Sequence, residues 1–130
     1  MTIQETLTKH LVGRRTTTAD RDTLTLDNGT TLRLYESTYD CCAGAGGKWK
    51  ILDPDRLEAA ITHVEYESDG YKDFYTRVTK CRITILHNQN HIAIGDGHAD
   101  AGNDGSYFSA LSLEVTVDGT TVHDEEVISA

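Results

Sequence analysis

The sequence has little proline and cysteine and no long apolar run, and its last third lacks basic residues. One residue in 130 is proline and three are cysteine. A secreted scaffold of this size usually carries an even set of cysteines at loop spacings, so a disulfide framework is not predicted. No stretch approaches the roughly 18 apolar residues of a membrane span, and the first residues lack the basic flank and apolar core of a secretory signal. We therefore expect a cytoplasmic protein without membrane contact.

Lysine and arginine are absent from residues 91–130, and this absence dominates the charge distribution. The net charge is −9, and residues 1–50 contribute only +1 and residues 51–90 only −2. Residues 91–130 contain eight acids, namely Asp96, Asp100, Asp104, Glu114, Asp118, Asp124, Glu125 and Glu126. Such a surface repels phosphate backbones and attracts cations or basic partners, so direct nucleic-acid binding is disfavoured.

The composition is typical of a soluble globular protein, with 38 % apolar and 25 % charged residues. A chain of this length buries roughly two thirds of its unfolded surface when it folds. We found no internal repeat, linker or low-complexity segment. The sequence therefore predicts a single domain over residues 1–130.

Two short helices are expected, over about residues 3–11 and 54–61. Thr2 and Glu5 have the spacing of a capping box, and apolar residues follow at four-residue intervals. Pro54 suits the first position of the second helix, where its missing N–H costs nothing.

The remaining pattern is typical of antiparallel strands. Asn28 and Gly29 lie between two segments in which leucine alternates with polar residues, as in a tight hairpin that needs positive φ angles. Asp118 and Gly119 indicate a second such turn. Further strands are expected over about residues 14–19, 48–52, 64–66, 73–79, 81–87, 91–95, 107–117 and 120–123. We predict a mainly β fold of the α+β type, an antiparallel sandwich or partly open barrel.

The least ordinary segment is Tyr39–Gly47, in which two adjacent cysteines precede a glycine-rich run. The run is expected to be irregular, either a close approach of the backbone or a surface loop, because it matches neither glycine-rich nucleotide-binding motif. Asp40 would raise the pKa of a neighbouring thiol, and no zinc-finger spacing includes Cys41 and Cys42. We predict structural roles for Asp40, Cys41, Cys42 and Gly29, with the two cysteines buried; metal binding and redox chemistry are the alternatives.

Residues 95–105 are predicted to form an acidic loop between two strands. Oxygen ligands recur there at two-residue spacing, as calcium requires, but Tyr107 stands where an EF-hand has its glutamate. Sites gather on such loops, so the candidate binding residues are Asp96, His98, Asp100 and Asp104. They could hold a divalent metal or a small ligand, although no cofactor is expected.

No catalytic arrangement is recognisable. The histidines are scattered, there is no Ser/His/Asp ordering, and no pair of acids has a spacing that places both on one face of a long element. The sequence therefore favours a non-enzymatic protein and identifies no catalytic residue.

Five motifs resemble a family of small bacteriophage and bacterial proteins described only as a domain of unknown function. They are Leu11-Val12-Gly13-Arg14, Leu26-Asp27-Asn28-Gly29-Thr30, Asp40-Cys41-Cys42, Phe74-Tyr75 with Thr79, and Gly105-Ser106-Tyr107-Phe108-Ser109. The resemblance covers most of residues 11–117 and supplies no site residue; many relatives have an acid where Ala43 stands. It implies a phage origin, and therefore a place in the host cytoplasm.

The expected function is that of a phage accessory protein that binds a host or phage macromolecule. Its acidic last third would contact a protein with a basic surface. Two alternatives remain, a metal- or small-ligand-binding module that uses residues 95–105, and a virion structural or assembly component. The partner and the oligomeric state do not follow from the sequence.

Overall fold

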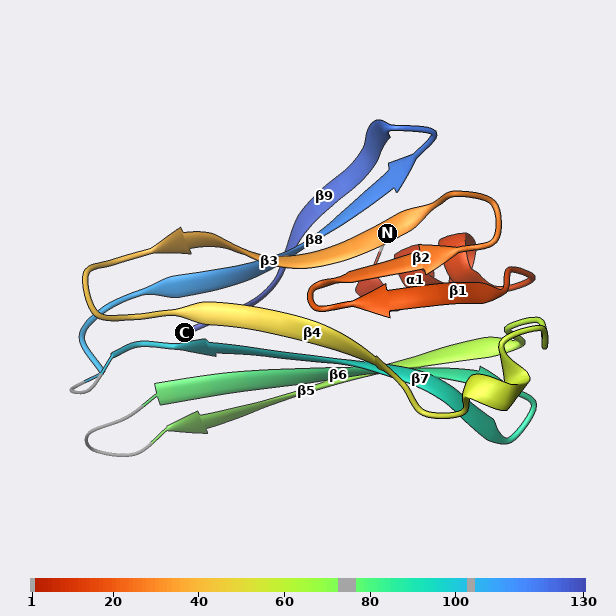
Figure 1. The fold of residues 1–130 in the computed structure, drawn as a ribbon. Coiled ribbons are helices and arrows are strands. Elements are labelled where there is room, and N and C mark those ends of the chain that lie inside the picture. Colours follow the sequence, from red (N-terminus) through yellow and green to blue (C-terminus); the bar gives the residue numbers. More distant parts are fainter. Residues whose placement is uncertain (1, 73–76, 103–104) are drawn as a thin grey trace.

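A computed structural model describes residues 2–72, 77–102 and 105–130 (Figure 1). Within these ranges the chain forms one α-helix, one short 3-10 helix and nine strands. The elements in chain order are α1 (Ile3–Leu11), β1 (Thr16–Asp20), β2 (Thr23–Leu26), β3 (Thr31–Tyr39), β4 (Ala45–Ile51), η1 (Pro54–Arg56), β5 (His63–Lys72), β6 (Arg77–His87), β7 (Asn90–Asp100), β8 (Ser109–Val117) and β9 (Thr120–Ser129). Residues 73–76 of the predicted strand 73–79 lie outside the described residues.

The strands form two antiparallel sheets that face each other, as Figure 1 shows. Sheet A has the order β1-β2-β3-β8-β9 and sheet B the order β4-β7-β6-β5. The prediction of a mainly β sandwich is confirmed; the described strands do not close into a barrel. No helix among the described residues is long and apolar enough to cross a membrane.

The two sheets approach closely because glycines replace side chains on the inner face of sheet B. A Cβ atom at Gly47 would lie 2.7 Å from Cβ of Leu34 in sheet A, and one at Gly95 would lie 2.7 Å from the Trp49 ring. At Gly97 a Cβ atom would overlap Leu111. Leucines of sheet A therefore pack directly on the backbone of sheet B, as strand glycines allow.

This packing overturns two predictions. The glycine-rich run was predicted to be irregular, yet residues 45–47 begin strand β4. Residues 95–105 were predicted to form a loop, yet β7 extends to Asp100. Glycine weakens an isolated strand, but here its missing side chain is what allows the sheets to pack. The part of the first prediction that named a close backbone approach is confirmed.

The first predicted helix is confirmed and the second is wrong. Thr2 Oγ1 accepts a hydrogen bond from the Glu5 N–H at 3.1 Å, as the capping box requires. Within the predicted second helix only Pro54–Arg56 is helical, as one 3-10 turn, and Asp53 makes no side-chain capping bond. The Ile61 N–H instead donates to Arg14 O at 2.8 Å. This long-range bond draws the end of the segment to a partner outside it, and residues 57–59 form turns and a bend in place of further helix. So short a helix has little stability of its own.

The two predicted tight turns differ in conformation. Asp118 and Gly119 both have positive φ, 51° and 78°, so this two-residue turn is confirmed. At the other turn only Gly29 has positive φ, 83°. Asn28 instead accepts a hydrogen bond from the Thr30 N–H through its side chain at 3.2 Å, as asparagine often does in turns.

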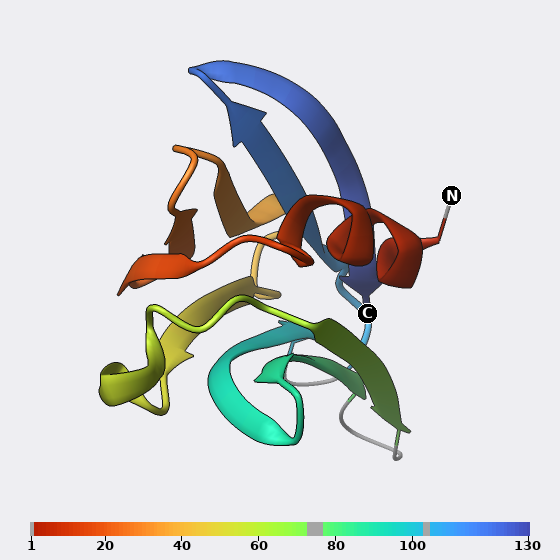
Figure 2. The same ribbon diagram turned by 90° about the vertical axis from the view of Figure 1, so that its right-hand side faces the viewer.

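Helix α1 lies between the two sheets at one side of the sandwich (Figure 2). Leu7 and Leu11 are fully buried there. Gln4 bonds to the β5 backbone, donating to Val64 O at 2.5 Å and accepting from the Tyr66 N–H at 3.0 Å. The helix thereby covers part of a strand edge that would otherwise be open for pairing.

Gly97→Ala is expected to destabilise the fold by about 1–3 kcal/mol, because the new methyl group must displace Leu111 and Cys81. Gly46→Ala is the matched control, since its Cβ would meet only the His98 ring at 3.4 Å, and its effect should stay within about 0.5 kcal/mol. Urea unfolding of both variants measures the difference. Equal stability of the two variants would contradict the close packing at Gly97.

Candidate functional site

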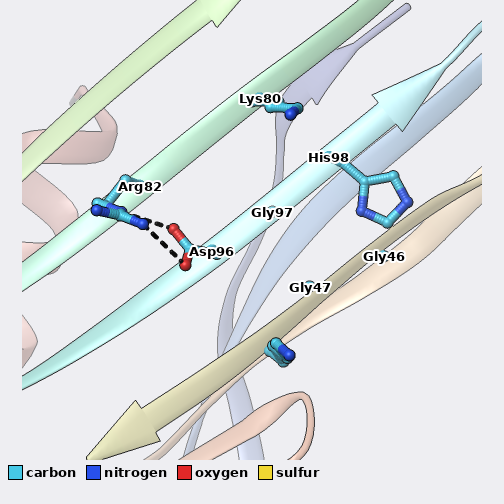
Figure 3. Close-up of a pocket in the computed structure, with 8 residues that line it drawn as sticks. Gly46, Gly47, Lys80, Arg82, Asp96, Gly97 and His98 are labelled. Carbon is cyan, nitrogen blue, oxygen red and sulfur yellow. Dashed lines mark hydrogen bonds and ion pairs between the residues drawn. The ribbon is translucent and has the colours of Figure 1, made fainter. Parts of the chain in front are cut away.

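The outer face of sheet B has a shallow hollow of about 770 Å³ across β4, β7 and β6 (Figure 3). Three basic residues, one histidine, one acid and three glycines line it. They are Gly46, Gly47, Lys48, Lys80, Arg82, Asp96, Gly97 and His98. We call this the basic hollow, because its cations outnumber its single acid.

Strand register brings these side chains together from three separate segments. Lys48 of β4 pairs with Asp96 of β7, which pairs with Arg82 of β6. In the next outward-facing row His98 lies between Gly46 and Lys80. Inward-facing residues alternate with these, so the glycine packing described above directs the charged side chains outward.

The acid of the basic hollow is engaged by one of its cations. Arg82 donates from Nε to Asp96 Oδ1 at 2.8 Å and from Nη2 to Oδ2 at 3.2 Å, a fork-like pair visible in Figure 3. This hydrogen bond raises the pKa of the Arg82 guanidinium. Among the described residues no ion pair involves Lys48 or Lys80. Asp69 of β5 lies opposite Lys80 in the sheet, so Lys48 is the less opposed of the two charges.

Gly46 has no side chain to fill the hollow beside His98. Its position in β4 faces outward beside the His98 ring, which lies 3.4 Å from where a Cβ would stand. Figure 3 shows the imidazole beside Gly46, with Lys80 on the neighbouring strand. A small anionic group could therefore approach the β4 backbone between the imidazole and the lysines.

Of the three predicted binding residues that the structure describes, two lie together. Asp96 and His98 line the basic hollow. Asp100 instead accepts hydrogen bonds from the N–H groups of Gly44 at 3.2 Å and Gly102 at 3.0 Å. Asp104 lies outside the described residues, within which no group of three His, Cys, Asp or Glu residues could hold a metal.

Sequence reasoning missed Lys48, Lys80 and Arg82. A signal was present, since Lys80 and Arg82 are two residues apart in a strand and so share one face. Lys48 could not be added, because its pairing with β7 joins segments almost fifty residues apart.

The prediction that Cys41 and Cys42 are buried is wrong. Both are exposed in the turn between β3 and β4, and their sulfurs are joined in a disulfide. The backbone just before the two cysteines is held to a distant segment, since the Asp40 N–H donates to Phe108 O at 2.7 Å.

Two motifs that carry the family resemblance meet at this turn. Asp40–Cys42 and Gly105–Ser109 are joined by the Asp40 bond to Phe108. The single proton of the buried Ser109 hydroxyl lies between two carbonyl acceptors, Asp100 O at 2.6 Å and Gly44 O at 3.0 Å from Oγ. The motifs therefore fasten this end of the sandwich, where the chain passes between the two sheets.

The acids of residues 91–130 divide between the sheets. Asp96 and Asp100 belong to sheet B, whereas Glu114 and Asp124 lie on the outer face of sheet A. Arg33 Nε is 3.1 Å from Glu114 Oε1. The Tyr35 hydroxyl donates to Asp124 at 2.7 Å, and this bond raises the pKa of that hydroxyl. The described acids of residues 91–130 therefore do not lie on one face as expected, and most of them belong to the β8–β9 hairpin.

The three cysteines are expected to differ in reactivity. Burial raises the pKa of the Cys81 thiol to about 11, so its thiolate fraction at pH 8 falls about 100-fold below that of an exposed cysteine. After reduction, iodoacetamide should alkylate Cys41 and Cys42 of the folded protein and leave Cys81 unmodified, as mass spectrometry can measure. Unfolding in urea supplies the control, with three adducts. Rapid triple alkylation of the folded protein would show that Cys81 is accessible.

Comparison with known proteins gives a family but no described activity. The profile of a domain of unknown function, DUF7448, matches residues 9–113. This match includes all strands that line the basic hollow, and it confirms the expected resemblance to an uncharacterised domain family. No curated protein and no solved structure matches the chain. Since residues 9–113 are most of the 130 residues, the chain belongs to the DUF7448 family of domains of unknown function.

Proposed function

We propose that the protein is a binding module for an anionic group, a phosphate or a carboxylate, held in the basic hollow. The observation that carries this proposal is the placement of Lys48 and Lys80, two cations without an ion pair among the described residues, around a hollow floored by glycine. Lys48, Lys80 and Arg82 bring three positive charges to this face of a chain of net charge −9. Asp96 in the lining and Glu67 and Asp69 on the adjacent strand β5 are the acids beside them. Charge-assisted bonds to an oxyanion are the strongest interaction that these side chains can offer.

The hydrogen bonds that Asp96 and Asp100 already accept favour an anion over a metal ion as the ligand. Asp96 already accepts two hydrogen bonds from Arg82, and Asp100 is turned toward backbone N–H groups. A cation entering the hollow would meet Lys48 and Lys80 at close range, which disfavours it electrostatically. The small-ligand alternative of the sequence analysis is thus retained at Asp96 and His98, and the ligand that we propose is an anion.

A non-enzymatic role remains part of the proposal. None of the side chains that line the hollow is a serine, threonine or cysteine, so it offers no hydroxyl or thiol for a base to activate. The phage origin and the place in the host cytoplasm stay predictions that rest on the family resemblance.

A second candidate function is binding of a basic protein surface by the β8–β9 hairpin. Asp118 and Glu126 are exposed, and no ion pair among the described residues neutralises them. A host or phage protein with a lysine-rich patch would fit this surface.

Inorganic phosphate is the first probe, followed by ¹H–¹⁵N NMR. Titration should shift the amide signals of Gly46, Gly47 and His98 most strongly. In Lys48→Gln/Lys80→Gln the apparent affinity should fall about tenfold, from the loss of two charge-assisted contacts. Lys9→Gln/Arg14→Gln removes the same charge from exposed positions elsewhere and should bind as the parent protein does.

Asp96→Asn distinguishes an anion site from a metal site by the sign of its effect. Removing this carboxylate frees Arg82 and should strengthen phosphate binding about threefold. A metal site would instead lose a ligand and bind its ion more weakly. Phosphate shifts spread evenly over the surface, or unaltered in the double lysine variant, would overturn the proposal.

A further inference from the structure

The molecule presents opposite charges on opposite sides. The basic hollow lies on the outer face of sheet B. The turn of the β8–β9 hairpin belongs to sheet A and lies far from sheet B in both Figure 1 and Figure 2. The hairpin therefore cannot reach the hollow of its own chain.

The hairpin has carboxylates that form no ion pair among the described residues. Asp124 and Glu126 lie two residues apart in β9 and share its outward face, and Asp118 is in the turn. Tyr35 donates to Asp124 but brings no charge. Glu114 is the acid of this face that Arg33 neutralises. Three acids thus remain unbalanced within the described residues, against Lys48 and Lys80 in the hollow.

One exposed apolar side chain lies near these acids. Val122 is 51 % exposed close to the same turn. Burial of this valine in a contact would remove apolar surface from water. The resulting hydrophobic contribution to the binding free energy would not be weakened by salt.

We infer that the acidic end of the β8–β9 hairpin of one copy docks in the basic hollow of a second copy. This rests on the proposed function, because it names the anionic group as a carboxylate of the same protein. Complementary charge selects this occupant, and the separation of the two surfaces makes the contact intermolecular. The contact joins two different surfaces, so in a pair one copy keeps its hollow free and the other keeps its hairpin free, and the assembly can continue as a chain.

The association is expected to be weak and sensitive to salt. Exposed ion pairs contribute little individually, and the Debye length falls from about 30 Å at 0.01 M salt to about 3 Å at 1 M. In light scattering, the average mass should rise with protein concentration at the lower salt. It should return to the 14.3 kDa of one chain at the higher salt.

Charge reversal tests which surfaces meet. Lys48→Glu/Lys80→Glu makes the hollow acidic, and Asp124→Lys/Glu126→Lys makes the hairpin basic. Each variant alone should stay monomeric at low salt, because its hairpin and hollow then have like charges. An equimolar mixture should assemble again, since each hollow finds a hairpin of opposite charge.

Matched controls reverse the same number of charges elsewhere. Lys9→Glu/Arg14→Glu and Asp55→Lys/Glu58→Lys should associate as the parent protein does. Melting temperatures within a few degrees of the parent establish that the variants are folded. Inorganic phosphate should compete with association in the parent protein.

Two outcomes overturn the inference. A parent protein that stays monomeric at low salt and high concentration excludes the contact, and the proposed function survives if phosphate still shifts Gly46 and His98. Association that persists in either charge-reversed variant alone shows that other surfaces meet. Loss of phosphate binding in Lys48→Gln/Lys80→Gln and of association in Lys48→Glu/Lys80→Glu, with recovery of association in the mixture, supports both proposals together.

Discussion

The structure depends on the direct packing of leucine side chains against glycine backbone. Leu34 and Leu111 of sheet A rest on Gly47 and Gly97 of sheet B, and the Trp49 ring covers Gly95. At each of these inward positions a Cβ atom would overlap a neighbouring side chain, so leucines of sheet A and Trp49 of sheet B itself fill the space that the glycines leave. The glycine content that made two segments look irregular in sequence is therefore what makes the sandwich pack.

The same constraint positions the candidate site. Strand residues alternate between faces, so an inward glycine directs its neighbours outward. Asp96 and His98 lie next to Gly97, and Lys48 follows Gly47. Their charged side chains meet Lys80 and Arg82 because β4, β7 and β6 are adjacent in sheet B. One packing requirement thus produces a core on one face and a basic hollow on the other, while the acids of β9 remain on the second sheet.

Local chemistry explains which predictions held. The Thr2 and Glu5 cap forms within four residues, and Asp118 with Gly119 needs only its own φ angles, so both could be predicted from sequence. The prediction of the second helix failed because the Ile61 N–H bonds to Arg14, far away in the chain, and not to the preceding turn. The buried position expected for Cys41 and Cys42 failed because composition does not reveal on which side of a turn a residue lies.

The sequence by itself determined the antiparallel β class, the first helix, the hairpin turns and the lack of basic charge after residue 90, because these depend on spacing and composition within short segments. Only the tertiary structure decided that the glycine-rich segments are strands and that Asp96 accepts hydrogen bonds from Arg82. It also decided that lysines from two distant strands surround one hollow. The physical reason is register: hydrogen bonding between strands places residues 48, 82 and 96 in one row, and no local pattern encodes which strands become neighbours.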